Sequence, residues 1–327
     1  GTKMSGDTKS NISVLWTTQG TNNIRVVETS TLGCVGAPIN LAVTINAQPE
    51  VSAPSYNLCP GISMQLSPSF GGTWIDPPPA YGLSISSSGL MTASSSAFAT
   101  TYNATFTETS TGCSNFVPVT ILPKPSTSSI TGQGVVCGEN ISGIPYNVTY
   151  TAGVTYAWTI TGGTQASGGN TNSITVNWGT AGTGSISVIP TSSNGCVGDA
   201  TTKLVNIYAI PVTSPITGST SICSETGGSL WVDGITYSVA NHDNSNYTWT
   251  VTGAQSYSSY RSQVQVLWGA AGPGMVSVVE TTTLGGCSAP AVNLPVTIHP
   301  IPVVSAPSPA VCYGNTMQLS PSSGGTW

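Results

Sequence analysis

The sequence repeats itself over a long interval. Residues 64–74 read MQLSPSFGGTW and residues 317–327 read MQLSPSSGGTW, so the same string returns 253 positions later with one change. A shorter repeat lies inside the long one, because YAWTITG at 156–162 recurs as YTWTVTG at 247–253. Repetition on this scale predicts a series of similar small modules, since each module buries its own core and length comes from adding copies.

Composition excludes several classes of protein. Only 5% of the residues are charged, against about a quarter in an average soluble protein. Hydrophobic residues make up 39% of the chain and the net charge is only -5, which argues against disorder. Six Lys and Arg in 327 residues offer no basic patch for nucleic acid, and no apolar run approaches the ~20 residues of a membrane span. We therefore expect no nucleic-acid partner and no transmembrane segment.

Within a module, apolar residues alternate with polar ones over short runs. Ile174, Val176 and Trp178 share one face of a predicted strand, and Gly-rich or Asn-rich turns follow at short intervals. About seven such strands in 80 to 90 residues indicate an antiparallel β-sandwich. The aromatic residues on the apolar phase of these strands are predicted to pack in the cores: Trp158, Trp178, Trp249 and Trp268.

Eight cysteines follow the module pattern, with one near the start and one near the end of each complete module. Pairing inside each module, between the opening segment and the last hairpin, predicts three disulfides: Cys59–Cys113, Cys137–Cys196 and Cys223–Cys287. Cys34 and Cys312 are left unpaired, each in a segment that we expect to hold only part of a module. Such bridges would each add ~4 kcal/mol and indicate an oxidising space outside the cytoplasm. Because no CxxC or His-bearing cluster exists, disulfides are favoured over metal ligation.

Candidate reactive residues are few. His242 lies in a polar loop and His299 in a proline-bearing linker, and neither neighbours a nucleophile motif, so we expect no catalytic site and no cofactor. The oxygen-rich stretch 241–246 is compatible with a calcium loop, but it lacks the EF-hand glycine and terminal Glu, which favours a polar hairpin tip. Trp231 has no counterpart in the preceding module and is the best candidate for an exposed, carbohydrate-binding aromatic residue.

Several motifs carry a family resemblance. The segments 126–208 and 211–299 contain I-T-G, (I/V)-C, Y-x-W-T-(I/V)-T-G and (I/V)-x-V-x-W-G in order, followed by a late G-C. In these features they resemble the PKD-like repeats of giant cell-surface gliding adhesins of Bacteroidota. The segment 50–123, with C-P-G, L-S-P, G-G-T-W and T-G-C, resembles the bacterial Ig-like module of the same proteins.

The resemblance gives the modules their names. We expect an all-β chain of tandem Ig-like and PKD-like sandwiches, joined by short proline-bearing linkers into an extended rod. The predicted segments are the end of a PKD-like module, an Ig-like module, two PKD-like modules and the start of an Ig-like module, at 1–46, 47–123, 124–208, 209–298 and 299–327.

The resemblance also implies a role outside the cell. It implies the stalk of a long secreted or cell-surface adhesin filament, exported by type IX secretion and used for surface adhesion in gliding motility. Candidate partners are the neighbouring repeats, surface polysaccharide, other filaments and, through regions outside this sequence, the gliding and secretion machinery. The alternative is a non-catalytic spacer or carbohydrate-binding region of a secreted polysaccharide-degrading enzyme.

Overall fold

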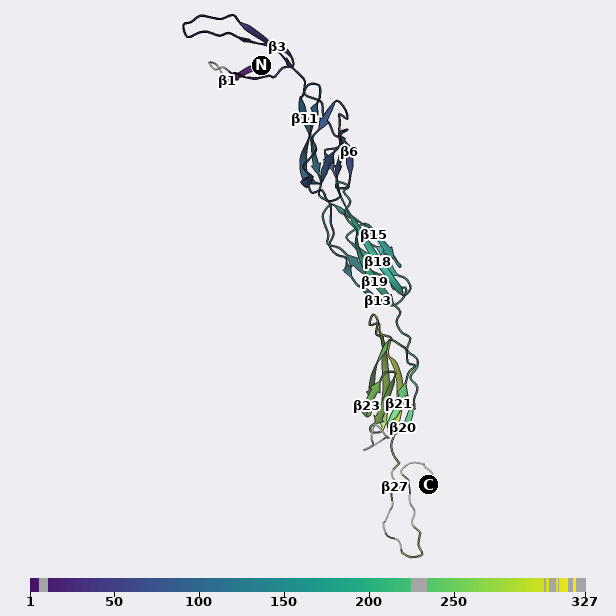
Figure 1. The fold of residues 1–327 in the computed structure, drawn as a ribbon. Coiled ribbons are helices and arrows are strands. Elements are labelled where there is room, and N and C mark those ends of the chain that lie inside the picture. Colours follow the sequence, from purple (N-terminus) through teal and green to yellow (C-terminus); the bar gives the residue numbers. More distant parts are fainter. Residues whose placement is uncertain are drawn as a thin grey trace. The chain divides into compact units, whose positions relative to one another are not determined.

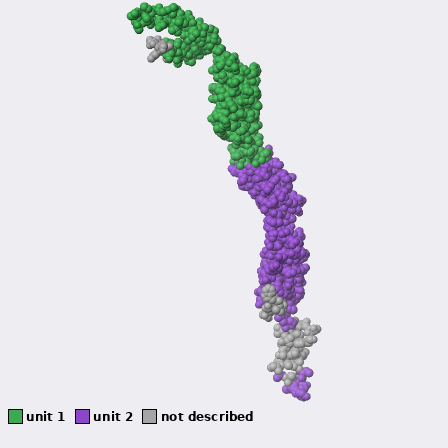
Figure 2. Space-filling view, viewed as in Figure 1, with its two compact units in different colours: residues 1–127, 150–157, 189–200 green, residues 128–149, 158–188, 201–327 purple. Residues whose placement is uncertain are grey.

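The computed structural model (Figure 1) is built from β-strands, with one short 3-10 helix among the described elements. The structure describes residues 1–5, 11–224, 234–302, 304–305, 310, 312–316 and 320–321. The chain divides into two compact units (Figure 2): residues 1–127, 150–157 and 189–200, and residues 128–149, 158–188 and 201–327. The fold is all-β, with several β-sandwich modules in tandem, which confirms the predicted fold class.

The Ig-like segment lies wholly within the first unit. Its elements are β5 (Asn57–Leu58), β6 (Ser63–Gln65), β7 (Gly72–Trp74), the 3-10 helix η1 (Pro79–Tyr81), β8 (Leu83–Ile85), β9 (Leu90–Ala93), β10 (Thr100–Glu108) and β11 (Ser114–Ile121). They form two sheets, of order β5-β11-β10-β7 and β6-β9-β8. Between the sheets lies one apolar core, which includes Trp74, Met91 and Phe106. The two layers explain the alternation of the sequence, since each strand turns one face toward that core.

The middle segment has the same kind of architecture. Its strands are β12 (Thr131–Gly132), β13 (Val135–Cys137), β14 (Ile144–Asn147), β15 (Val154–Thr161), β16 (Gly163–Ser167), β17 (Ser173–Trp178), β18 (Gly182–Ser192) and β19 (Thr201–Tyr208). The sheets have the order β12-β14-β17-β16 and β13-β19-β18-β15.

The third sandwich lies in the second unit and repeats this plan. Its described strands are β20 (Ser221–Cys223), β21 (Ile235–Ser238), β22 (Ser245–Thr252), β23 (Ala254–Tyr260), β24 (Gln263–Trp268), β25 (Gly272–Thr282) and β26 (Val292–His299). The sheets are β20-β26-β25-β22 and β21-β24-β23.

The two flanking segments hold only strand pairs among their described residues. In segment 1–46 these are β1 (Thr2–Ser5) with β2 (Ser13–Leu15) and β3 (Gly20–Val26) with β4 (Ile39–Ile45). In segment 299–327 they are β27 (Val304–Ser305) and β28 (Ser320–Pro321). Every sheet draws its strands from a single predicted segment, with β26 running one residue past the predicted boundary at 298.

The predicted strand phases agree with the burial of the side chains. Ile174, Val176 and Trp178 are buried on β17, and the residues between them are only partly buried. Trp249 and Trp268 are buried in the third sandwich, as predicted. Trp158 is only half-buried, and its Nε1 donates a 2.8 Å hydrogen bond to the Thr171 carbonyl, so it lies at the margin of the core.

A tyrosine and a tryptophan form the centre of both the middle and the third sandwich. In the third sandwich the Tyr237 and Trp268 rings meet edge to face, with centroids 6.0 Å apart, and Trp268 Nε1 donates to Tyr237 Oη. Two glycines make room for them, because a Cβ atom at Gly274 would lie 2.4 Å from the Trp268 ring and one at Gly218 would lie 2.2 Å from the Tyr237 ring. The middle sandwich repeats this packing with Trp178, Tyr146, Gly184 and Gly132.

Candidate functional site

A short strand near the start of each sandwich, which we call its opening strand, pairs in parallel with the last strand. The opening strand is β5 in the Ig-like segment, β13 (which follows β12) in the middle segment and β20 in the third sandwich. Leu58 on β5 faces Ile121 at the end of β11, Cys137 on β13 faces Tyr208 at the end of β19, and Cys223 on β20 faces His299 at the end of β26. A cysteine at the end of the opening strand therefore lies beside the point where the chain leaves the module. Cys59, Cys137 and Cys223 lie at or directly after this position, and Cys312 is the repeat equivalent of Cys59. We call these four residues the exit cysteines.

The other four cysteines lie in the hairpin that precedes the last strand. In each hairpin, a backbone N–H four or five residues before the cysteine donates to the cysteine carbonyl, at 2.9 to 3.0 Å; the donors are Ser30, Glu108, Ser192 and Thr282. A nearby Ser or Thr hydroxyl also accepts a hydrogen bond from each cysteine N–H, at 3.0 to 3.2 Å. We call these residues the hairpin cysteines: Cys34, Cys113, Cys196 and Cys287.

The two cysteines of one sandwich therefore lie at opposite ends of its last strand. In the Ig-like segment, Cys113 directly precedes β11, whereas Cys59 follows the residue that pairs with the end of β11. The eight residues of β11 span seven rises of about 3.4 Å, so its ends lie roughly 24 Å apart. A disulfide needs Cα atoms about 4.4 to 6.8 Å apart. In the third sandwich, β26 separates Cys223 and Cys287 in the same way.

The structure joins different modules instead. Cys59 of the Ig-like segment is bonded to Cys196 of the middle segment, and Cys137 of the middle segment is bonded to Cys287 of the third, each with Cα atoms 5.3 Å apart. The predicted pairings Cys59–Cys113, Cys137–Cys196 and Cys223–Cys287 are therefore wrong. Cys113 and Cys223 are unpaired, as are Cys34 and Cys312, which were predicted to be. The sequence shows that each module has one cysteine near its start and one near its end. It does not show that these two cysteines lie at opposite ends of the last strand.

Around the first inter-module disulfide, the hairpin of Cys196 contacts the linker that leaves the Ig-like segment. A Cβ atom at Gly198 would lie 2.1 Å from the Pro125 carbonyl oxygen, so glycine is needed for this approach. Next to it, Lys124 Nζ lies 2.5 Å from Asp199 Oδ1. The Asp199 side chain is 86% exposed, so this ion pair contributes little to stability.

Around the second disulfide, an aromatic ring covers the hairpin. A Cβ atom at Gly285 would lie 2.2 Å from Cδ2 of Tyr208, the residue that faces Cys137 in the sheet. Beside this contact, the linker residues Ile210 and Val212 and the hairpin residues Ala289 and Pro290 line an apolar pocket of about 360 Å³. This junction thus combines a covalent bond with close packing.

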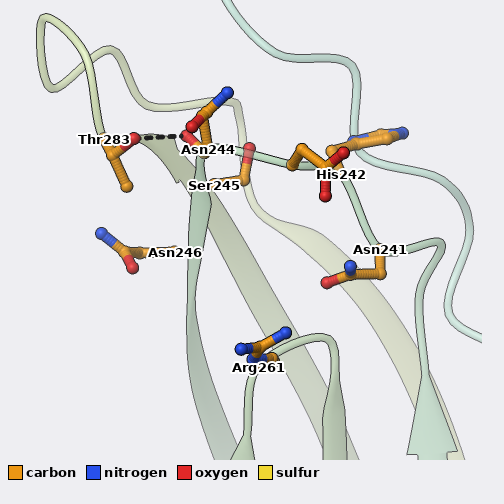
Figure 3. A pocket seen from close by; sticks show the side chains of 8 residues that line it. Asn241, His242, Asn244, Ser245, Asn246, Arg261 and Thr283 are labelled. Atoms are coloured by element: carbon orange, nitrogen blue, oxygen red, sulfur yellow. Dashed lines mark hydrogen bonds between the residues drawn. The ribbon is translucent and has the colours of Figure 1, made fainter.

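A polar pocket of about 610 Å³ lies at the turn before β22 (Figure 3). It is lined by residues 241–246 with Arg261 and Thr283, and the Thr283 hydroxyl and N–H both donate to the Asn244 carbonyl. Residues 243–244 form a turn in which Asn244 has a positive φ of 62°. The predicted hairpin tip is wrong, because this turn joins β21 to β22, which lie in different sheets and pair with β24 and β25.

A buried carboxylate lies next to this turn. Glu280 is fully buried, and its Oε1 accepts hydrogen bonds from Ser245 Oγ at 2.7 Å and from His242 Nδ1 at 2.8 Å. Its Oε2 and the Thr213 hydroxyl are buried without a hydrogen-bond partner of good geometry. Burial alone would raise the pKa of Glu280, but the hydroxyl of Ser245, the His242 ring and its charge, and the nearby Thr213 hydroxyl together lower that pKa below 4.5.

The remaining sequence candidates do not form a reaction centre with one another. His299 Nε2 is 2.9 Å from the Ser221 hydroxyl across the parallel strand pair, far along the chain from His242. Trp231 lies outside the described residues. In the described part of the chain, no three His, Cys, Asp or Glu side chains gather as a metal site would require. The one described helix, η1, is far too short to cross a bilayer.

Comparison with known proteins names one module. Residues 123–206 match the PKD-like domain family. The middle segment is therefore similar to a PKD-like domain over nearly all of its length. No curated protein sequence matches the chain. The disulfide-bonded PKD-like and Ig-like sandwiches are domains of the extracellular type.

Three solved structures illustrate the similarity to known folds. Fibronectin(III)-like modules of Clostridium thermocellum CbhA share 11% identity, over 54% of this chain and 94% of that one, with a TM-score of 0.33. Three immunoglobulin domains of titin share 9%, over 77% and 98%, with a TM-score of 0.34. The D00-D0 domain of intimin shares 14%, over 51% and 98%, with a TM-score of 0.23.

The contact between Tyr208 and Gly285 can be tested against a neighbouring glycine. Gly285 and Gly286 both have a positive φ, 81° and 66°, so alanine is strained at either position. Only at Gly285 does the new methyl group collide with Tyr208, since nothing lies within 4 Å of a Cβ at Gly286. We expect Gly285→Ala to lower the melting temperature more than Gly286→Ala and to slow formation of the Cys137–Cys287 bond in refolding. Equal effects would show that Tyr208 does not hold this junction.

The lowered pKa of Glu280 predicts a pH dependence. A carboxyl whose folded pKa lies below its unfolded value contributes stability that is present above about pH 4.5 and is lost as the pH falls through the folded pKa. Thermal unfolding followed from pH 6 to pH 2.5 should show a smaller acid-induced drop in melting temperature for Glu280→Gln than for the natural chain. Glu28→Gln, at the exposed repeat equivalent, should leave the drop unchanged. Parallel curves for Glu280→Gln and the natural chain would contradict this account.

Proposed function

We propose that this chain is a structural segment of a long extracellular adhesin filament and that it carries tension without a catalytic role of its own. The observation that supports this most directly is the pair of inter-module disulfides across three consecutive sandwiches. A disulfide inside a module protects that module alone. A disulfide between modules secures the junction, which is the weakest point of a chain of small domains under load.

The two disulfides also overlap along the sequence. Cys137 lies inside the loop closed by Cys59–Cys196, and Cys196 lies inside the loop closed by Cys137–Cys287. When both are closed, tension can pass from Cys59 to Cys196, back along the chain to Cys137, and across to Cys287. That route contains the 59 residues from 137 to 196, whereas the uncrosslinked chain contains 228 residues from 59 to 287. Even a fully unfolded chain would therefore stay short between these points.

Single-molecule pulling tests this limit. At about 3.5 Å per extended residue, the oxidised chain should reach a contour length shorter by roughly 600 Å than the reduced chain. The double variant Cys196→Ser with Cys287→Ser should match the reduced chain under oxidising conditions. The control Cys34→Ser, which removes an unpaired cysteine, should behave as the natural oxidised chain does. Equal contour lengths for oxidised and reduced protein would reject a tension-limiting role.

The finer proposal is that the filament is a gliding adhesin of the SprB type, exported by type IX secretion. Its support is the set of motifs shared with the PKD-like and Ig-like repeats of that family, including Ile216-Thr-Gly218 and Tyr247 to Gly253. In this role the stalk would present adhesive regions to surface polysaccharide or to other filaments while the machinery of the cell moves its anchored end.

Antibodies raised against residues 124–298 provide the test of that finer proposal. They should label intact, unpermeabilised cells of the source organism, and the label should travel along the cell during gliding. Label that is confined to the cell interior, or that is shed into the medium with a polysaccharide-degrading enzyme, would reject it.

A further inference from the structure

The two disulfides of the structure follow one rule. In each, the exit cysteine of a sandwich is bonded to the hairpin cysteine of the sandwich that follows it: Cys59 with Cys196, and Cys137 with Cys287. The rule follows from topology, because the exit cysteine lies where the chain leaves its module. The hairpin cysteine lies at the other end of the last strand, where the preceding module is attached.

The four unpaired cysteines have the same local structures as the bonded ones. Cys113 and Cys34 have the hairpin hydrogen bonds of Cys196 and Cys287. Cys223 pairs with the end of the last strand as Cys137 does. The last of them, Cys312, accepts a hydrogen bond from the N–H three residues later, as Cys59 does.

The long sequence repeat adds an independent observation. It aligns Cys312 with the bonded Cys59 and Cys34, through the flanking E-T-(S/T)-T-L-G string, with the bonded Cys287. Residues equivalent to two unpaired cysteines are therefore seen in disulfides within this same chain.

Burial distinguishes the bonded hairpin cysteines from the unpaired ones. The bonded Cys196 and Cys287 are 1% and 0% exposed. Cys113 is only partly buried and Cys34 is exposed. The sequence explains why no partner is at hand: segment 1–46 contains no cysteine but the hairpin residue Cys34, and segment 299–327 contains none but the exit residue Cys312.

We propose that Cys34, Cys113, Cys223 and Cys312 are disulfide sites, each specific for a cysteine of the opposite class on an adjacent sandwich of the same repeat. Cys113 and Cys34 take the exit cysteine of a preceding module, and Cys223 and Cys312 take the hairpin cysteine of a following module. Every module is then bonded to both of its neighbours, in a continuous covalent ladder. This inference concerns linkage alone and does not rest on the proposed adhesive role.

The chemistry is an ordinary thiol oxidation. Two S–H bonds break and one S–S bond forms, with loss of two protons and two electrons. A small disulfide such as oxidised glutathione accepts the electrons and is released as two thiols. The specificity comes from the sandwich ends, which bring one exit and one hairpin cysteine together at each junction.

The long repeat allows two copies of the chain to be joined in register, because residue 299 is the repeat equivalent of residue 46. A tandem chain made of residues 1–298 followed directly by residues 46–327 gives the third sandwich a complete Ig-like module to follow it. In this chain the rule pairs Cys223 of the first copy with Cys113 of the second. Both copies contain a Cys113 and a Cys223, and their peptides are identical. We therefore replace Cys113 in the first copy and Cys223 in the second by serine, so that a Cys113–Cys223 peptide can come only from the predicted bond between the copies.

After refolding with glutathione, peptide mapping without reduction should find Cys113 bonded to Cys223 in nearly all molecules. The bonds Cys59–Cys196 and Cys137–Cys287 in the same sample show that the modules have folded. A matched chain that also carries Cys113→Ser in the second copy should leave Cys223 open to alkylation. If Cys223 stays free, or bonds to Cys287 of its own module, while those two bonds have formed, the ladder is refuted.

Discussion

The parallel pairing of the opening strand with the last strand controls where the cysteines of each sandwich lie. Three short ladders, β5 with β11, β13 with β19 and β20 with β26, hold the end of the opening strand against the end of the last. The last strand is also the second arm of a hairpin, so its two ends are the two ends of the module. One cysteine is thus placed at the exit and one at the entrance. A chain of such modules brings unlike cysteines together only across a junction.

This arrangement suits a chain with so few charges. With 5% charged residues, the modules cannot rely on ion pairs to hold their junctions, and the one ion pair at the first junction is largely exposed. Close packing contributes at Gly198 and Gly285, where backbone or ring atoms would collide with any side chain. The disulfides close loops of 137 and 150 residues, which on the chain-entropy model adds about 5 kcal/mol each. Covalent bonds therefore carry most of the stability between modules, while tyrosine–tryptophan cores serve within them.

Sequence reasoning was sufficient for features that depend on local pattern. Alternation predicted the strands of Ile174 to Trp178 and the burial of Trp249 and Trp268, because one face of a strand must meet the core. The pairing of the cysteines depends on which strands are neighbours, and no local pattern carries that information. Pairing within modules and pairing between modules both leave Cys34 and Cys312 unpaired, so these two residues do not distinguish the two schemes. What separates the two pairings is the position of Cys137 on an opening strand that lies parallel to the last strand. The buried Glu280 was also missed, since the hydroxyl and ring that stabilise it come from a distant turn.

The pairing itself can be read directly from the oxidised protein. Free thiols are alkylated and the chain is digested with pepsin at low pH, where thiolate exchange is suppressed and where a chain with six Lys and Arg residues is still cut into small pieces. Mass spectrometry without reduction should then find Cys59 linked to Cys196, Cys137 linked to Cys287, and four alkylated cysteines. Peptides that link Cys59 to Cys113, or Cys223 to Cys287, would contradict the account at its foundation.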